Sequence, residues 1–163
     1  MMANGAQPVA DARKMVVTSI GNAGFVVTSG TVRLVFDPLI SMFPMDQWIP
    51  GSPCAGPDIV LITHDHWDHF DVSDVAELAK RTGASVVGSG AVANKLARLL
   101  PAGQIIAQEP SERGGPVEAR GGDISITTFR TLHGQRHNSY RVEWPGFRIF
   151  HDGDNEHTEC LDR

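Results

Sequence analysis

Residues 59–69 read Ile-Val-Leu-Ile-Thr-His-Asp-His-Trp-Asp-His, an apolar run followed at once by three histidines and two aspartates. A short apolar run of this kind predicts a buried strand, which places the histidine cluster at the end of that strand. In an extended segment, residues i and i+2 project to the same side, so His64 and His66 can converge on one ion. Asp68 and His69 are adjacent and point apart, which suits them to a second ion or to holding a water molecule. The stretch therefore predicts a metal site.

Further ligands are expected from a second window. All seven histidines lie within positions 64–69 and 133–157. His133 follows a predicted strand and could complete a three-histidine site, and Asp152 and Asp154 follow another, where either carboxylate could bridge two ions. A single surface histidine or aspartate needs no ligand, but this concentration favours a metal centre. Neutral imidazole and carboxylate suit Zn²⁺, Mn²⁺ or Fe²⁺, and zinc is the first choice on ligand type.

Composition limits the class of protein. The chain has 163 residues, 41% hydrophobic and 20% charged, with a formal net charge of -5, which is typical of a globular protein. The acidic balance disfavours a nucleic-acid partner held by its phosphates. Neither a secretory signal nor a membrane span is visible, and Cys54 and Cys160 give no disulfide framework. We expect a cytoplasmic protein, and we leave a homo-oligomer open.

Hydrophobic patterning predicts a loose tail over residues 1–14 and one domain over residues 15–163. Three β-rich runs open the domain as an antiparallel meander, and strands then alternate with helices, which indicates layered α/β architecture. The expected strands are 15–20, 25–28, 32–36, 59–62, 84–87, 105–107, 124–129, 139–143 and 147–150, and the expected helices are 73–81 and 91–100. Residues 111–122 are turn-rich and predict no strand.

Residues 38–57 hold five prolines, so regular structure is not expected there. The same stretch is apolar, with Leu39, Phe43 and Trp48 among its members. It is either a lid that faces the substrate or a loop packed on the core.

The histidine cluster resembles the H-x-H-x-D-H signature of the metallo-β-lactamase superfamily. Supporting matches are Gly21-Asn22-Ala23-Gly24-Phe25, Phe36-Asp37-Pro38, His133-Gly134 and His151-Asp152-Gly153-Asp154. Among the branches of the superfamily, the sequence looks most like the one that includes L-ascorbate-6-phosphate lactonase. The resemblance extends from about Met15 to Asp154.

The resemblance implies an αββα sandwich, of α/β (α+β) class, with two divalent metals at one edge. By position, the first metal would be held by His64, His66 and His133, the second by Asp68 and His69, and Asp154 would bridge them. A metal-bound hydroxide would attack an ester, lactone or phosphoester bond of a small substrate, phosphorylated ones included. Asp68 would orient that hydroxide or take up its proton, and Asp37 would support the ligands without being one.

The chain departs from the family pattern at two points. Asn22 stands where family members usually carry histidine. The last histidine of the second metal normally lies well beyond the bridging aspartate, and His151 or His157 would have to replace it. The C-terminal half of the sandwich is accordingly expected to be cut short. The alternative function is a metal-binding but catalytically inactive member of the family.

Two other readings stay open at this point. Gly88-Ser89-Gly90-Ala91-Val92-Ala93 follows a strand and opens a helix, as a dinucleotide fingerprint would, with Glu109 near the ribose position. Small residues at a tight turn need no ligand, however, and this reading leaves the histidines unexplained. The arginines Arg130, Arg136, Arg141 and Arg148 could face a polynucleotide or, equally, a phosphorylated small molecule, but a solvated strand face is the better explanation, and the acidic net charge agrees with it.

Overall fold

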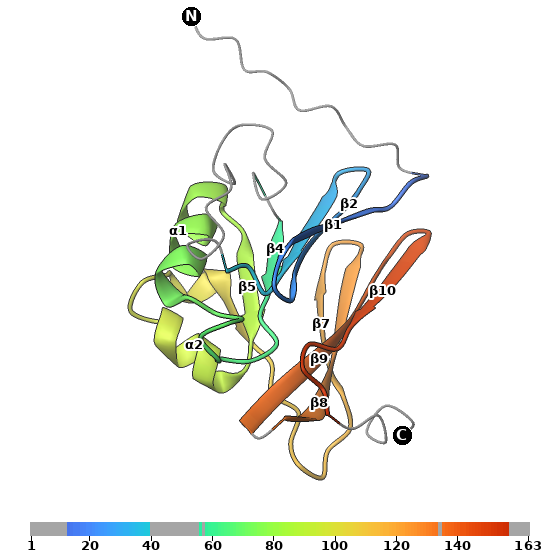
Figure 1. Cartoon of the computed structure of the whole chain (residues 1–163). Helices are drawn as coiled ribbons and strands as arrows, with labels where there is room; N and C mark the ends of the chain where they lie inside the picture. The colour runs from blue at the N-terminus through green and yellow to red at the C-terminus, as the bar shows by residue number, and fades with distance from the viewer. Residues whose placement is uncertain (1–12, 40–55, 57, 134, 157–163) are drawn as a thin grey trace, which may run out of the picture.

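The computed structural model describes residues 13–39, 56, 58–133 and 135–156 (Figure 1). These residues form two β-sheets, with two α-helices on the outer side of the first sheet. The first sheet holds β1 (Val16–Gly21), β2 (Gly24–Ser29), β3 (Val32–Phe36), β4 (Ile59–Leu61), β5 (Ser85–Gly88) and β6 (Ile105–Ala107). The second holds β7 (Val117–Gly121), β8 (Ile124–His133), β9 (Gln135–Trp144) and β10 (Phe147–His151). The helices are α1 (Val72–Thr82) and α2 (Gly90–Leu96), with a short 3₁₀ turn at Ala102–Gln104.

The first sheet follows chain order from β1 to β6. The pairs β1·β2 and β2·β3 are antiparallel, which confirms the predicted meander, and the pairs from β3 to β6 are parallel. Parallel neighbours need crossover connections, which α1 and α2 supply on one face. The carboxyl ends of the parallel strands therefore meet at one edge of the sheet, and the histidine cluster leaves from the end of β4.

The second sheet is antiparallel, in the order β10-β9-β8-β7, and packs against the first. One apolar cluster fills the space between helices and first sheet, and another joins the two sheets. Hydrogen bonds also link the sheets, from the Tyr140 hydroxyl to the Ile62 carbonyl at 2.6 Å and from the Asn138 amide to the Thr63 carbonyl at 2.9 Å. The layers among the described residues are thus helix, sheet and sheet, an α+β arrangement; the fourth, helical layer of the expected sandwich is not among them.

The ends of α1 follow from its sequence. The carboxylate of Asp71 accepts from the amides of Ser73 and Asp74 at the N-terminus, which satisfies donors that have no partner in the helix. Gly83 ends the helix with φ at 78°, a left-handed conformation that glycine adopts freely. The helix extends one residue beyond each end of the predicted range 73–81.

The largest differences from the predicted elements are at the end of α2, at β7, and at the facing ends of β8 and β9. Helix α2 ends at Leu96 rather than Leu100, because the Leu99 amide bonds to the carbonyl three residues before it, that of Leu96, at 2.8 Å. Strand β7 lies in a segment predicted to be turns. Strands β8 and β9 extend to His133 and from Gln135, since their polar residues pair across the hairpin as Thr131 with His137 and Arg130 with Asn138. Backbone pairing holds these strands where the apolar alternation stops.

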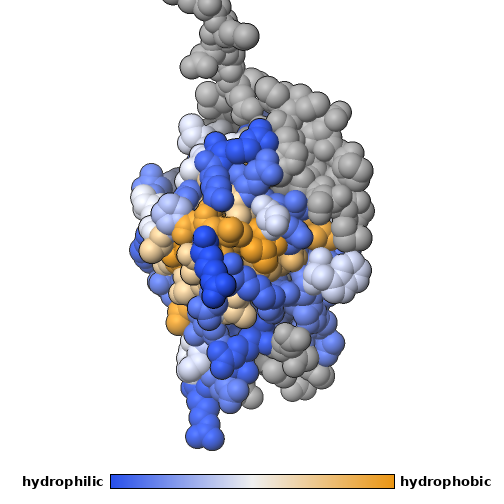
Figure 2. Space-filling model, turned by 90° about the vertical axis from the view of Figure 1, so that its left-hand side faces the viewer, coloured by the Kyte–Doolittle hydropathy of each residue, from blue (hydrophilic) through white to orange (hydrophobic). Residues whose placement is uncertain are grey.

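The helical side of the molecule carries an apolar band bordered by hydrophilic residues (Figure 2). Leu99, just beyond α2, is 40% exposed. A single exposed leucine is ordinary on a folded protein. No helix among the described residues is long and apolar enough to cross a membrane.

Several sequence predictions fall outside the described residues. They concern nearly all of the loose tail, residues 40–55 and 57 of the proline-rich loop, Cys54, Cys160 and His157.

Candidate metal centre

A tight turn after β4 carries the histidine cluster. The amides of His69 and Phe70 both donate to the His66 carbonyl, at 3.1 and 2.9 Å. Phe70 is 4% exposed and anchors the far end of the turn in the core between the helices and the first sheet. The turn therefore gathers the predicted ligands His64, His66 and His69 at one point.

His64 lies at the centre of a group of imidazole rings. Its ring centroid is 4.4 Å from that of His66, 4.3 Å from His69, 5.0 Å from His133 and 4.8 Å from His137. The side chain of His64 is fully buried. His133 reaches the group from the end of β8, as the sequence predicted for its place at a strand end.

Two sets of side chains have donor atoms close enough to share an ion. In each set the donor atoms lie within 4.8 Å of one another, and the two sets are His64 with His66 and His133, and His64 with His69 and Asp154. The first set is the trio predicted for the first metal. The second joins His69 and Asp154, but it takes His64 in place of Asp68, whose Oδ2 is 3.9 Å from Nε2 of His69.

The buried carboxylate of Asp37 accepts hydrogen bonds from the residues of the turn. Its Oδ1 accepts from the Thr63 amide at 2.7 Å, and its Oδ2 accepts from the Thr63 hydroxyl at 2.7 Å and from Nδ1 of His69 at 3.1 Å. Its φ of 41° is a conformation that aspartate tolerates better than most residues. Burial alone would raise the pKa of Asp37, but hydrogen bonds from His151 and His69 outweigh it and hold this pKa below its ordinary value.

The hydrogen bonds around Thr63 set the tautomer of His64. Because the Thr63 hydroxyl donates to Asp37, it accepts from Nδ1 of His64, which lies 3.0 Å away. The other nitrogen, Nε2 of His64, is then unprotonated, and it is buried with no hydrogen-bond partner among the described residues. Burial, followed by the neighbouring His69 and His137, lowers the pKa of His64 to about 3. His64 is therefore a neutral imidazole that presents a free lone pair to the other rings.

His69 and His133 repeat this arrangement. Nδ1 of His69 faces Asp37, and Nδ1 of His133 lies 3.1 Å from Oε1 of Glu156. Their Nε2 atoms face Asp154, whose Oδ2 is 3.1 Å from His69 and 3.9 Å from His133. Burial opposes a charge on His69, but the hydrogen bond with Asp37 outweighs it and raises the pKa of His69. An oxygen acceptor on the far nitrogen is the usual way of orienting a histidine toward a metal.

Other predicted residues lie near this group without joining it. Nε2 of His151 is 3.3 Å from Oδ2 of Asp37, and its ring packs 4.9 Å from that of Phe36, so it supports Asp37 and is in neither donor set. The Asn22 side chain donates to the Asp68 carbonyl and so contacts the turn directly. Oδ1 of Asp152 accepts a hydrogen bond from the Ser139 hydroxyl at 3.1 Å.

Sequence reasoning missed the roles of Thr63, His137 and Glu156. His137 is 1% exposed, and its Nε2 accepts from the Asp154 amide at 3.1 Å. Burial lowers the pKa of His137 to about 4. The histidine-rich second window signalled His137, but only the pairing of β8 with β9 shows its direction.

The glycine-rich turn before α2 is explained by packing. The Ser89 hydroxyl caps the helix, and the Gly90 amide donates to Glu109 Oε2 at 2.9 Å. A Cβ on Gly88 would lie 2.7 Å from a methyl of Val92. The glutamate proposed for a ribose therefore already occupies the helix N-terminus, and the close helix packing accounts for the glycine.

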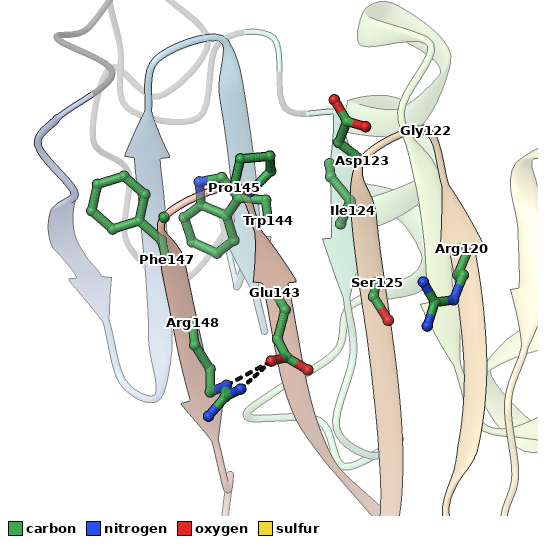
Figure 3. Close-up of a pocket in the computed structure, with 11 residues that line it drawn as sticks. Arg120, Gly122, Asp123, Ile124, Ser125, Glu143, Trp144, Pro145, Phe147 and Arg148 are labelled. Carbon is green, nitrogen blue, oxygen red and sulfur yellow. Dashed lines mark hydrogen bonds and ion pairs between the residues drawn. The ribbon is translucent and has the colours of Figure 1, made fainter.

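A pocket opens at the opposite end of the second sheet (Figure 3). It is lined by residues from the ends of β7, β8, β9 and β10, among them Arg120, Asp123, Glu143, Trp144, Phe147 and Arg148. Arg148 pairs with Glu143 there, and no histidine lines it. This pocket is separate from the candidate metal centre.

The chain is similar to one described domain family and to proteins named as metal-dependent hydrolases. The model of the β-lactamase superfamily domain matches residues 32–162. A UPF0173 metal-dependent hydrolase of Thermococcus onnurineus is 32% identical over 85% of this chain and 60% of its own length. One from Methanopyrus kandleri is 35% identical over 73% of this chain and 47% of its own length. The chain thus spans about 60% or less of the length of these relatives.

Solved structures agree on the fold. The metallo hydrolase Igni18 of Ignicoccus hospitalis superposes with a TM-score of 0.64 at 22% identity, covering 86% of this chain and 61% of its own. The metallo-β-lactamase fold protein YhfI of Bacillus subtilis superposes with a TM-score of 0.55 at 19% identity, covering 78% and 52%. The predicted fold class is confirmed, whereas the lactonase branch stays a prediction.

Proposed function

The chain belongs to the metallo-β-lactamase superfamily, and from this premise we propose that it is a metal-dependent hydrolase of an ester, lactone or phosphoester bond. The substrate is a small molecule, phosphorylated ones included. The names of the curated relatives support hydrolysis. They carry no information on the substrate, whose identity depends on loops around the site.

One observation carries the proposal: Nε2 of His64 is buried without a hydrogen-bond partner among the described residues. Leaving a buried polar atom unpaired costs about 1–3 kcal/mol. One donor atom of His64 lies within 4.8 Å of donor atoms of His66 and His133 in one set and of His69 and Asp154 in the other. A divalent cation at this point would satisfy His64 and fits the donor set.

Zinc is the metal we propose, with manganese or iron as alternatives, because the donors are imidazoles and carboxylates without a thiolate. Two ions are proposed, one held by His64, His66 and His133 and one by Asp68 and His69. The position of Asp154 between His69 and His133 supports its role as the bridge.

When bound, such metals lower the pKa of a water molecule and polarise the bond to be cleaved. Residues of the chain itself orient the histidines that would hold the metals. Asp37 and Thr63 fix His64 and His69, and Glu156 fixes His133. Asp68 has a side chain 37% exposed beside His69, which suits it to accept a proton from water at the rim of the site.

Small substrates are favoured over polynucleotides because the four arginines that could have faced a polynucleotide are already ion-paired. Arg130 pairs with Glu112 and Arg136 with Glu109, while Arg141 and Arg148 share Glu143. The net charge of -5 acts in the same direction.

The test is metal analysis of the purified protein, followed by a screen of lactone, ester and phosphodiester substrates before and after chelation. We expect two ions per chain and a turnover that chelation removes. His66→Ala should abolish turnover with an unchanged circular dichroism spectrum, because His66 is in the three-histidine set and outside the apolar core. Full turnover in His66→Ala would refute the site.

A metal-binding but inactive protein is the second candidate. It is favoured by the absence of Asp68 from both donor sets, which leaves the second ion with fewer close donors among the described residues. One ion per chain, without turnover on any of the substrates, would support this candidate.

A further inference from the structure

His137 sits among the histidines of the candidate metal centre yet belongs to neither donor set. It lies on β9 and is 1% exposed. Its ring centroid is 4.8 Å from that of His64 and 5.7 Å from that of His133. A buried histidine this close to predicted ligands needs a role of its own.

The hydrogen bonds of His137 fix its tautomer. A backbone amide can only donate, so Nε2 of His137 accepts from the Asp154 amide across 3.1 Å and carries no proton. The ring proton of the neutral imidazole is then on Nδ1, which donates to the Thr131 hydroxyl at 2.5 Å. The lone pair of Nε2 is thus already in use, which explains why His137 is not placed as a ligand.

The neighbouring backbone is shaped to this ring. Gly153 has φ at 60°, and a Cβ built on it would lie 2.6 Å from Nε2 of His137 and 3.0 Å from Cβ of Thr63. Only glycine allows the chain to pass so close in that conformation. The peptide before Asp154 is therefore held between β9 and the turn after β4.

We infer that His137 is a positioning residue for Asp154, an inference that rests on the proposed metal-dependent function. By accepting the Asp154 amide, the imidazole sets where the backbone of residue 154 lies. From there the Asp154 carboxylate reaches Nε2 of His69 at 3.1 Å and Nε2 of His133 at 3.9 Å. His137 thereby places the proposed bridging carboxylate between the two donor sets without touching a metal.

The test compares two substitutions by metal binding rather than by turnover. His137→Gln keeps an acceptor at the position of Nε2, whereas His137→Leu fills the same space without one. Zn²⁺ alone is titrated by calorimetry into chelated protein, and Co²⁺ is titrated with its visible absorption as a signature of ligand geometry. Thr128→Val is the matched control, since it removes another buried hydroxyl hydrogen bond, to Gln108, away from Asp154.

We expect two ions in the unmodified protein, in His137→Gln and in Thr128→Val, with the same Co²⁺ spectrum. His137→Leu should bind the weaker ion about tenfold to a hundredfold less tightly, the usual effect of losing a residue that orients a ligand, and its Co²⁺ spectrum should change. Circular dichroism of the chelated proteins checks that each variant is folded.

Three outcomes decide against the inference, each in a different way. Unchanged binding of both ions by His137→Leu overturns it and leaves the proposed function intact. Equal loss in His137→Gln and His137→Leu also overturns it, because the imidazole itself is then a ligand. No binding by the unmodified protein removes the proposed function, and the inference with it.

Discussion

Two regions contribute the predicted ligands in different ways. The turn over residues 62–70 supplies four of them, His64, His66, Asp68 and His69, from six consecutive positions closed by two hydrogen bonds to one carbonyl. Residues 131–156 supply His133 and Asp154 from separate strand ends. The first region is organised locally, with Asp37 as its support. The second depends on strand pairing and on contacts with His137, Gly153 and Glu156, which suggests that it is more easily disturbed.

Each region holds one buried neutral histidine, and these two histidines should make the stability of the protein depend on pH. The pKa is lowered to about 3 for His64 and to about 4 for His137. Below pH 6.5 the unfolded chain binds protons that the folded chain excludes, so stability falls as pH decreases. Each histidine contributes about 1.4 kcal/mol per pH unit, and both together about 5 kcal/mol between pH 6.5 and 4.5.

Denaturant unfolding of chelated protein measures this slope. His69 does not add to it, because its raised pKa gives stability that is fully present below pH 6.5 and is lost only at higher pH. His137→Gln should halve the slope. An unfolding free energy that does not change with pH, or a slope that His137→Gln leaves unaltered, would contradict the prediction that each region holds one neutral buried histidine.

Asp37→Asn removes the charge that supports the turn. Asparagine tolerates the φ of 41°, so the backbone is kept. The variant should lose about 3 kcal/mol of unfolding free energy, the order expected when one partner of a buried charged pair is removed. Zn²⁺ affinity should fall about a hundredfold, since His64 and His69 both lose their orientation.

Calorimetric Zn²⁺ titration and unfolding at pH 7 test Asp37→Asn. The stability that Asp37 gives is present above its ordinary pKa of 3.8 and is lost as pH falls below that value, so pH 7 shows the full effect. Near-normal zinc affinity in this variant would show that the turn holds its ligands without Asp37.

The difference between the regions also explains what the sequence could predict. Contiguous motifs report local geometry, so the histidine cluster and helix α1 were evident, and the apolar runs predicted the first sheet nearly strand by strand. The contacts of Thr63, His137 and Glu156 depend on which face of a twisted hairpin meets the turn after β4. That choice is made by pairing and packing over long sequence distances, for which a single sequence has no signal.

Gly153→Ala tests the second region alone. Its Cβ would strike His137 in a strained backbone, whereas a Cβ on Gly146, with φ at 86°, meets nothing within 4 Å. Gly146→Ala is thus the matched control. Both variants should lose about 1–2 kcal/mol of stability from backbone strain, and only Gly153→Ala should bind Zn²⁺ about tenfold more weakly. Equal zinc affinity in the two variants would contradict the close fit at Gly153.

The smallest effect is expected at the ion pair between α2 and the turn. Nζ of Lys95 lies 2.8 Å from Oδ2 of Asp65, and it holds the pKa of Asp65 below its ordinary value despite partial burial of the carboxylate. Lys95 is 45% exposed, so Lys95→Met should cost less than about 1 kcal/mol and less still at high salt. Arg120→Met, which breaks an exposed pair with Glu118 on the second sheet, is the control.

Zinc affinity shows whether the ion pair of Lys95 with Asp65 is needed to hold the turn that carries the ligands. If the turn is held by its own hydrogen bonds and by Asp37, then Lys95→Met and Arg120→Met should both bind Zn²⁺ within about threefold of the unmodified protein, since exposed ion pairs contribute little. A tenfold loss of Zn²⁺ affinity in Lys95→Met alone, at every salt concentration, would show that the turn depends on α2. The contrast between a locally organised turn and a dependent second region would then no longer hold.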